Sequence, residues 1–157
     1  MKLHYPLIAL LIGLYNLSCQ AEPLQIQTTT LQGEKISTLG KVTYLKFWAT
    51  WCRYCIEEMP HLEQAFKTRS AKLNVVSVNI GLNQSPELVK RFLDKHDYHT
   101  ATAFDHDGSL SKKFNVIGTP THILLDEQGQ EIYRTALIND ELNSALSAYL
   151  PKENNHD

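Results

Sequence analysis

Two cysteines, Cys52 and Cys55, are the residues whose spacing points most directly to a chemical reaction. With two residues between them, their sulfurs can close and open a disulfide, as a redox-active dithiol does. Only a thiolate attacks a disulfide, so the attacking sulfur needs a lowered pKa. If a helix begins near Cys52, its free N–H groups and dipole stabilise negative charge on that sulfur, whereas Cys55 lies one turn further in. The spacing therefore predicts that Cys52 attacks a partner's disulfide and that Cys55 resolves the mixed disulfide.

The side chains beside the pair add charge and aromatic surface. Arg53 places a cation next to the predicted thiolate of Cys52, which lowers the pKa of that thiol. The same cation stabilises the reduced form and so favours a stronger oxidant. Trp51 and Tyr54 offer aromatic edges on which a partner protein can rest. We therefore expect Trp51, Arg53 and Tyr54 to contact the substrate.

A Cys-x-x-Cys pair can also be half of a zinc site or one bridge of a disulfide framework. The chain has 3 cysteines, and the third, Cys19, lies near the N-terminus, outside the expected domain, so a framework of several disulfides is excluded. Zinc requires two further ligands. The chain has no second cysteine pair, and its 7 histidines form no closely spaced pair near the expected strands. The sequence therefore predicts no metal at the pair.

A strand before the pair and a helix after it are expected to position the sulfurs. The segment 42–47 is rich in β-branched and aromatic residues, as a buried strand is. From Cys52 to about Ser70 apolar residues recur at three- and four-residue spacing, which predicts a helix with a kink at Pro60. Further strands are expected at 24–30 with a partner near 36, and at 73–80, 102–105, 121–126 and 131–135; further helices are expected at 85–93, 109–114 and 139–150, capped by Ser85, Ser109 and Asn139.

This order of elements predicts an α/β protein. Strands and helices alternate first, and a β-hairpin and a helix follow, which favours a mixed central sheet covered by helices on both sides, with an N-terminal hairpin or strand pair. A length of 157 residues with 43% hydrophobic and 20% charged residues is ordinary for one globular domain. The net charge of −2 gives no sign of a nucleic-acid surface.

Residues 1–21 are predicted to be a targeting segment outside the fold. Lys2 precedes the apolar run 7–14, whose length suits a signal peptide and is short for a membrane span. The residues around Ala21 fit a cleavage site that leaves a mature chain from Glu22. A lipoprotein signal with the lipid on Cys19 and an uncleaved membrane anchor are the alternatives. All three readings place the domain outside the cytoplasm, in the periplasm or tethered to a membrane.

The domain is expected over residues 22–151, and residues 152–157 form a polar tail that is predicted to be flexible. Once Cys19 is removed or lipidated, the domain keeps one thiol pair, Cys52 and Cys55. In an oxidising compartment such a pair either cycles with partner proteins or stays closed.

A proline directly before a strand is the second candidate feature. Gly118-Thr119-Pro120-Thr121 leads into the strand expected at 121–126, and a proline in such a turn is a candidate for a cis peptide. It would present the backbone edge of Thr119 to an incoming substrate strand. The alternative is an ordinary loop proline.

These motifs together resemble the thioredoxin superfamily, and within it the extracytoplasmic TlpA/ResA/CcmG(DsbE)-like thiol–disulfide oxidoreductases. The resemblance covers roughly residues 24–150. It is carried by Trp-Ala-Thr-Trp-Cys-x-x-Cys, Glu-Glu-Met-Pro, Asn-Ile-Gly and Gly-Thr-Pro-Thr-x-Ile-Leu-Leu-Asp. It implies a thioredoxin-like fold with a central insertion at about 79–104, a cis-proline at Pro120, and reduction of protein disulfides with electrons from a membrane thiol reductase of the DsbD/CcdA kind. No cofactor is implied.

Two positions are compared with that family. Thioredoxins keep a buried Asp six residues before the first cysteine, where this chain has Lys46; this difference favours the extracytoplasmic branch. In several relatives an acid three residues after the second cysteine tunes the site, and Glu58 occupies that place. Glu58 either takes part in proton transfer or belongs with Glu57 to a solvated helix face.

Other activities of the same fold remain open. A disulfide oxidase or isomerase is one alternative. A Cu(I) metallochaperone that uses Cys52, Cys55 and His122 is another, because copper-delivering proteins of this fold combine a cysteine pair with a distant histidine. If the protein does not deliver copper, His122 is simply a residue of the strand expected at 121–126.

Overall fold

The computed structural model describes residues 23–150. The predicted targeting segment 1–21 and the tail 152–157 lie outside these residues, so both remain predictions. Within the described residues, no helix has the length and apolar character needed to cross a membrane.

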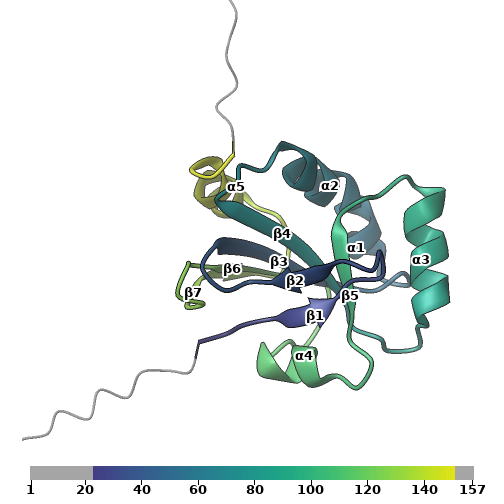
Figure 1. The fold of residues 1–157 in the computed structure, drawn as a ribbon. Coiled ribbons are helices and arrows are strands. Elements are labelled where there is room, and N and C mark those ends of the chain that lie inside the picture. Colours follow the sequence, from purple (N-terminus) through teal and green to yellow (C-terminus); the bar gives the residue numbers. More distant parts are fainter. Residues whose placement is uncertain (1–22, 151–157) are drawn as a thin grey trace, which may run out of the picture.

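A five-stranded mixed sheet forms the centre of the domain, as predicted (Figure 1). In spatial order the strands are β5 (Ala101–Phe104), β4 (Leu73–Asn79), β3 (Val42–Trp48), β6 (Thr121–Leu125) and β7 (Glu131–Thr135). The central strand β3 is parallel to β4 and antiparallel to β6. All seven residues of β3 are buried, which explains why its sequence does not alternate between polar and apolar residues.

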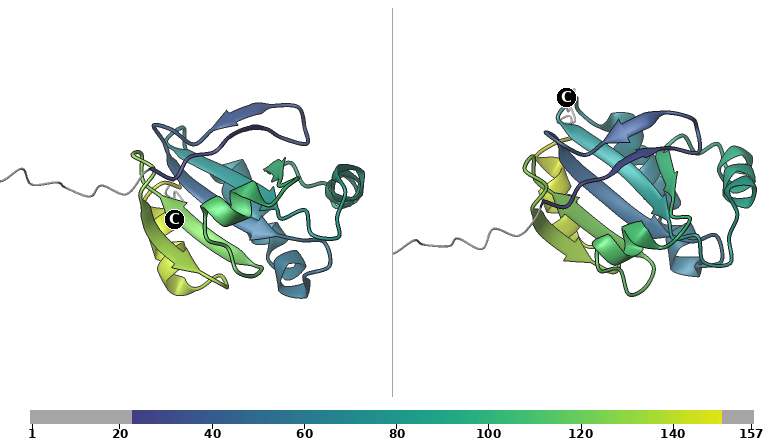
Figure 2. Two further views of the ribbon diagram at one scale, coloured as in Figure 1. Left: turned by 90° about the horizontal axis from the view of Figure 1, so that it is seen from below. Right: turned by 60° about the horizontal axis from the view of Figure 1, so that its bottom comes forward.

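One face of the sheet is covered by four helices: α1 (Arg53–Glu57), α2 (Met59–Thr68), α3 (Pro86–Lys95) and α5 (Asp140–Ser147). They share one apolar core with Tyr44 and Trp48 of β3. The other face is covered by α4 (Ser109–Lys113) and by the antiparallel pair β1 (Gln27–Thr29) and β2 (Lys35–Ser37), which lies above the sheet in the left view of Figure 2. Their core contains Phe47 and Phe114. The predicted helices on both sides and the N-terminal strand pair are confirmed.

Two local predictions are wrong. The helix expected from Cys52 to Ser70 is two helices separated at Glu58, and Pro60 lies in the first turn of α2, where its missing N–H leaves no hydrogen bond unmade. The expected cap Ser109 is the first helical residue of α4, because the Asp107 carboxylate accepts its N–H at 3.0 Å and Gly108 takes the cap position. The caps Ser85 and Asn139 are confirmed.

Candidate active site

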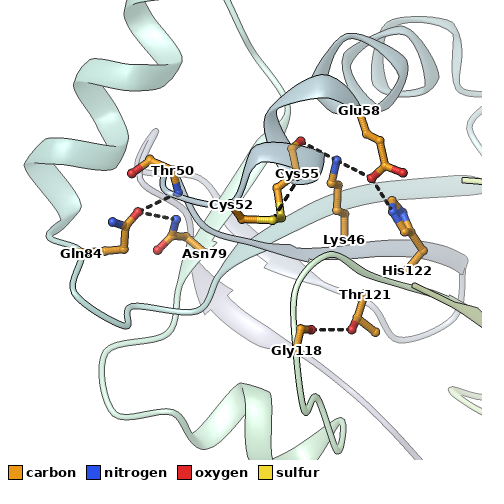
Figure 3. The surroundings of a disulfide bond; sticks show 10 residues. All are labelled: Lys46, Thr50, Cys52, Cys55, Glu58, Asn79, Gln84, Gly118, Thr121 and His122. Atoms are coloured by element: carbon orange, nitrogen blue, oxygen red, sulfur yellow. Dashed lines mark hydrogen bonds and ion pairs between the residues drawn. A yellow bond between two sulfur atoms is a disulfide. The ribbon is translucent and has the colours of Figure 1, made fainter. Parts of the chain in front are cut away.

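The two cysteines form a disulfide at the junction of β3 and α1, with their Cα atoms 5.2 Å apart (Figure 3). Cys52 is the N-cap of α1, and its sulfur accepts the N–H of Cys55 at 3.2 Å. Cys52 retains 7% exposure, whereas Cys55 has none. Of the two cysteines, only Cys52 therefore reaches the surface. Because α1 has five residues, this direct N–H contact, rather than the dipole of a long helix, is the local stabilisation that the backbone gives Cys52.

The cis-proline loop lies at the same end of the sheet as the disulfide. Phe47 of β3 pairs with Thr121 of β6, and the two strands are antiparallel. Pro120, directly before Thr121, therefore lies at the end of β3 from which the chain continues to Cys52. The peptide bond between Thr119 and Pro120 is cis, as predicted. The hydroxyl of Thr121 donates to the carbonyl of Gly118 at 2.7 Å and closes the turn (Figure 3).

The three side chains predicted to contact substrate lie at the surface beside the sulfurs. Trp51 and Tyr54 are 52% and 59% exposed, and the indole N–H of Trp51 donates to the carbonyl of Leu82 at 2.9 Å. Arg53 is also exposed, but its guanidinium donates to the carboxylate of Glu57 at 2.8 Å. The cation that the sequence places beside the thiolate is therefore paired with a carboxylate one turn further along the helix.

A second cation lies beneath the disulfide, in the interior. Lys46 of β3 has no exposed surface, and its ammonium donates to the carbonyl of Cys55 at 2.9 Å. The same Nζ lies 3.3 Å from Oε2 of Glu58. Glu58 reaches it because the helix is interrupted at this residue, and its side chain is 14% exposed. The alternative that Glu58 belongs to a solvated helix face is therefore wrong.

His122 and Tyr44 complete this buried cluster. Lys46 and His122 are cross-strand partners, and Nε2 of His122 lies 2.9 Å from Oε2 of Glu58. Nδ1 of His122 lies 2.7 Å from the hydroxyl of Tyr44. The network assigns the proton of the imidazole to Nε2, which donates to Glu58, while Nδ1 accepts from Tyr44. The other oxygen of Glu58 accepts the backbone N–H of Ile138 at 2.8 Å.

At pH 7 the cluster holds one positive charge, on Lys46, and one negative charge, on Glu58. Burial lowers the pKa of Lys46 to about 8, against the attraction of Glu58. Burial raises the pKa of Glu58, but the hydrogen bonds from His122 and Ile138 and the charge of Lys46 outweigh it and lower that pKa to about 2. Burial lowers the pKa of His122 and raises that of Tyr44, so both are neutral at pH 7. The ammonium and the carboxylate therefore balance each other.

The loop after β4 holds the segment that precedes Cys52. The side-chain oxygen of Gln84 accepts the N–H of Thr50 at 2.9 Å and the amide of Asn79 at 3.3 Å (Figure 3). At the start of this loop, Gly81 passes close to the backbone after β5, where a Cβ would lie 2.2 Å from the oxygen of Asp105. Two side-chain contacts, from Gln84 and Trp51, thus tie the predicted insertion to the active-site loop.

The described residues 23–150 contain no cluster of three or more His, Cys, Asp or Glu side chains that could hold a metal ion. Cys52, Cys55 and His122 therefore do not form the site that a Cu(I) chaperone would need. Both ring nitrogens of His122 are engaged, by Tyr44 and Glu58. Nothing in the geometry favours the copper alternative.

The sequence singles out the two cysteines, the proline loop and Glu58, but not the network that joins Glu58 to Lys46 and His122. In the sequence Lys46 stands out only because thioredoxins have an acid at that place, and His122 stands out only as a copper ligand or a strand residue. Gln84 gave no signal of its own, because a glutamine in a loop has no preferred role. A polar residue within the apolar run of β3 is the signal that could have singled out Lys46, since a buried charge requires a partner.

A thioredoxin-like fold that carries a disulfide-bonded Cys-x-x-Cys pair opposite a cis-proline defines the class of thiol–disulfide oxidoreductases. The chain belongs to the Redoxin family, whose model matches residues 23–149. Thioredoxin-like protein YneN of Bacillus subtilis is 37% identical over 123 residues, which are 74% of this chain and 72% of that protein. Thiol-disulfide oxidoreductase ResA of Bacillus thuringiensis is 31% identical over 127 residues, 79% of this chain and 72% of that protein.

Solved structures give the same result. The crystal structure of StoA from Bacillus subtilis matches with a TM-score of 0.72 and 27% identity over 80% of this chain and 97% of that chain. A secreted Mycobacterium tuberculosis disulfide oxidoreductase homologous to E. coli DsbE matches with a TM-score of 0.65 and 26% identity over 80% of this chain and 96% of that chain. The predicted superfamily, fold class and oxidoreductase activity are confirmed.

Proposed function

We propose that this chain is an extracytoplasmic thiol–disulfide oxidoreductase that reduces selected protein disulfides through Cys52 and Cys55. The pairing of the exposed cation beside the sulfurs supports the reducing direction. Arg53 is paired with Glu57 at 2.8 Å. A free cation at this position would stabilise the thiolate of Cys52 and make the disulfide a strong oxidant. The pairing of Arg53 therefore favours the lower potential of a reductase.

In the proposed reaction the thiolate of Cys52 attacks one sulfur of a client disulfide. A mixed disulfide forms, and the other client sulfur leaves as a thiolate that takes up a proton. Cys55 then loses its proton and attacks the sulfur of Cys52, the bond to the client breaks, and the second client sulfur is protonated. Two electrons pass from the domain to the client, whose disulfide becomes two thiols while the domain's disulfide closes.

The client is proposed to bind along the cis-proline loop. Thr119 and Pro120 would present their backbone edge to an extended client segment, between the aromatic side chains of Trp51 and Tyr54. One observation supports a binding surface here: Ile117 is 97% exposed two residues before Thr119. An apolar side chain next to the client's cysteine would bury this surface.

Glu58 is proposed to take part in proton transfer at Cys55. Its carboxylate lies 3.3 Å from the ammonium of Lys46, which in turn lies 2.9 Å from the carbonyl of Cys55. Lys46 therefore stands between Glu58 and the cysteine, and the carboxylate acts through it.

The location and the electron donor complete the proposal. The apolar run 7–14 and the similarity to a secreted disulfide oxidoreductase support a domain outside the cytoplasm. A membrane thiol reductase of the DsbD/CcdA type would then return electrons to Cys52 and Cys55. Mass spectrometry of the chain expressed in full tests the location: an N-terminus at Glu22 or a lipid on Cys19 supports export, and an intact soluble chain contradicts it.

The reduction potential tests the direction of electron flow. The domain is equilibrated in buffers of reduced and oxidised glutathione or dithiothreitol, and the fraction of disulfide is measured. A potential near that of thioredoxin, about −270 mV, is expected for a reductase. A value near that of the strong oxidant DsbA, about −120 mV, would contradict the proposal and favour an oxidase or isomerase.

A further inference from the structure

A fully buried lysine beneath a redox-active disulfide requires a physical reason. Lys46 lies on the central strand with no exposed surface. Removing an ammonium group from water costs several kcal/mol, which one ion pair rarely returns in full. A Met or Leu at this position would fill the same space without that cost. The lysine therefore destabilises the fold relative to an apolar residue, and a role in the reaction can account for it.

We propose that Lys46 is a positioning residue for the resolving cysteine, Cys55. The buried charge of the Lys46 ammonium stabilises the thiolate of Cys55 whenever the disulfide is open. Its ammonium is bonded to the backbone carbonyl of that same cysteine at 2.9 Å. Figure 3 shows the order of the groups: Cys55, then Lys46, then Glu58, then His122 on the far side. The ammonium of Lys46 thus lies between the Cys55 carbonyl, 2.9 Å away, and the Glu58 carboxylate, 3.3 Å away.

This order matters because Cys55 has no exposed surface. A thiolate formed there is not stabilised by water, and burial in apolar surroundings raises the pKa of a thiol. Screening by salt is also weak in the interior, so a neighbouring cation acts more strongly than at the surface. The exposed Arg53, paired with Glu57, cannot supply this effect to a buried sulfur.

The same charge assists exchange in both directions. When a mixed disulfide resolves, the Cys55 thiolate attacks the sulfur of Cys52, a new S–S bond forms and the client sulfur leaves. In the reverse direction a client thiolate attacks Cys52, and Cys55 leaves as the thiolate. Lys46 stabilises Cys55 as nucleophile in the first case and as leaving group in the second. The inference therefore rests on the oxidoreductase activity and not on the proposed reducing direction.

Several other titratable groups face Lys46. Glu58 lies at the break between α1 and α2 and keeps the ammonium protonated. His122 on β6 is neutral, with its nitrogens bonded to Glu58 and Tyr44. His61 on α2 has a pKa that is lowered by burial and by the charge of Lys46, so it adds no cation at neutral pH. Within this set Lys46 carries the positive charge, and its ammonium is bonded to the Cys55 carbonyl.

The first experiment removes the charge and measures the cysteine. In reduced Lys46→Met and Lys46→Gln proteins, the pKa of Cys55 is followed by the ¹³C NMR shift of its Cβ. We expect a rise of at least about one pH unit in both variants, which is a tenfold loss of thiolate below the pKa. A more basic thiolate is also more nucleophilic, and this partly offsets the tenfold loss of thiolate. The resolution of a mixed disulfide should therefore slow only about threefold.

The pair of variants separates charge from geometry. Gln keeps a neutral donor for the Cys55 carbonyl, so a Gln variant that behaves like the wild type would overturn the proposal in favour of a hydrogen-bonding role. The double variant Lys46→Met/Glu58→Gln removes both charges. If it restores the wild-type pKa of Cys55, Lys46 acts only by neutralising Glu58, and the proposal is again overturned. Glu63→Gln, which removes a buried carboxylate bonded to Thr100 elsewhere, is the matched control and should leave that pKa unchanged.

A measurement on the wild-type protein covers the case in which the variants do not fold. If Lys46 stabilises the thiolate of Cys55, the thiolate must stabilise the ammonium by the same free energy. The pKa of Lys46, read from the NMR signal of its Cε or Nζ, should therefore be higher in the reduced protein than in the oxidised one. Equal values in the two redox states would refute the coupling.

Discussion

The imidazole of His122 and the carboxylate of Glu58 are hydrogen-bonded at 2.9 Å, although 64 residues separate them in sequence. This contact fixes the strand β6 to the interruption between α1 and α2. It also engages the ring nitrogen that faces Glu58, while Tyr44 engages the other. The pair therefore belongs to the support of the disulfide and not to a metal site.

Acid should destabilise the oxidised protein through this pair. The pKa of Glu58 is lowered to about 2 in the fold, so its contribution to stability is complete above its usual pKa of 4.5 and is lost as the pH falls toward 2. The pKa of His122 is also lowered, so its contribution is present above its usual value of 6.5 and declines below it. Both effects have the same sign, and urea unfolding between pH 2 and pH 8 should show stability falling steadily with acid.

The variant Glu58→Gln measures how much the carboxylate of Glu58 contributes to the free energy of unfolding. At pH 7 it should lower the free energy of unfolding by about 1–3 kcal/mol, because Lys46 loses its ionic partner. Its loss of stability between pH 5 and pH 2 should be smaller than that of the wild type. Glu57→Gln, at an exposed position, should change stability by less than about 0.5 kcal/mol. An identical acid profile for Glu58→Gln and the wild type would contradict the assignment.

Trapping of client proteins tests the roles of the two sulfurs. Cys55→Ser should accumulate mixed disulfides through Cys52, because the resolving thiol is absent. Non-reducing electrophoresis of the exported protein, followed by mass spectrometry, identifies the trapped clients. Cys52→Ser should trap few or none, since Cys55 has no exposed surface. If Cys52→Ser is the trapping variant, the roles are reversed.

Gln84→Ala tests whether the loop after β4 positions the active-site segment. The N–H of Thr50 loses its acceptor, and the expected loss of stability is about 1 kcal/mol. Hydrogen exchange of the Thr50 amide should accelerate, and the rate of disulfide exchange should fall, while the pKa of Glu58 is unaffected. Gln32→Ala, which loses a comparable contact with Thr102 far from the disulfide, is the control and should leave the exchange rate unchanged.

Trp51→Ala tests the proposed client surface. The indole is 52% exposed, so its loss should weaken binding of a disulfide-containing client by about tenfold, or about 1.4 kcal/mol. The reduction potential should stay the same, because the indole carries no charge. Ile132→Ala removes an equally exposed apolar side chain from the edge strand β7 and should not change client binding. A shift in potential without a change in binding would contradict the role.

The sequence by itself determined the class of this protein. Cys52 and Cys55 at a strand-to-helix junction, with Pro120 before a later strand, specify the reaction because each of these signals is local: spacing, turn chemistry and apolar runs are read within a few residues. The same locality explains the correct order of strands and helices along the chain and the caps at Ser85 and Asn139.

The tertiary structure decided what surrounds the sulfurs. From sequence, Arg53 is the cation beside the thiolate, yet in the fold it is exposed and paired with Glu57, while the buried Lys46 lies beneath Cys55. The interruption of the helix at Glu58 has the same origin, since its carboxylate turns inward to partners that arrive from β3, β6 and the segment before α5. Such contacts join residues far apart in the chain, and the free energy of a buried charge depends on all of its neighbours at once. Only the folded arrangement brings those neighbours together.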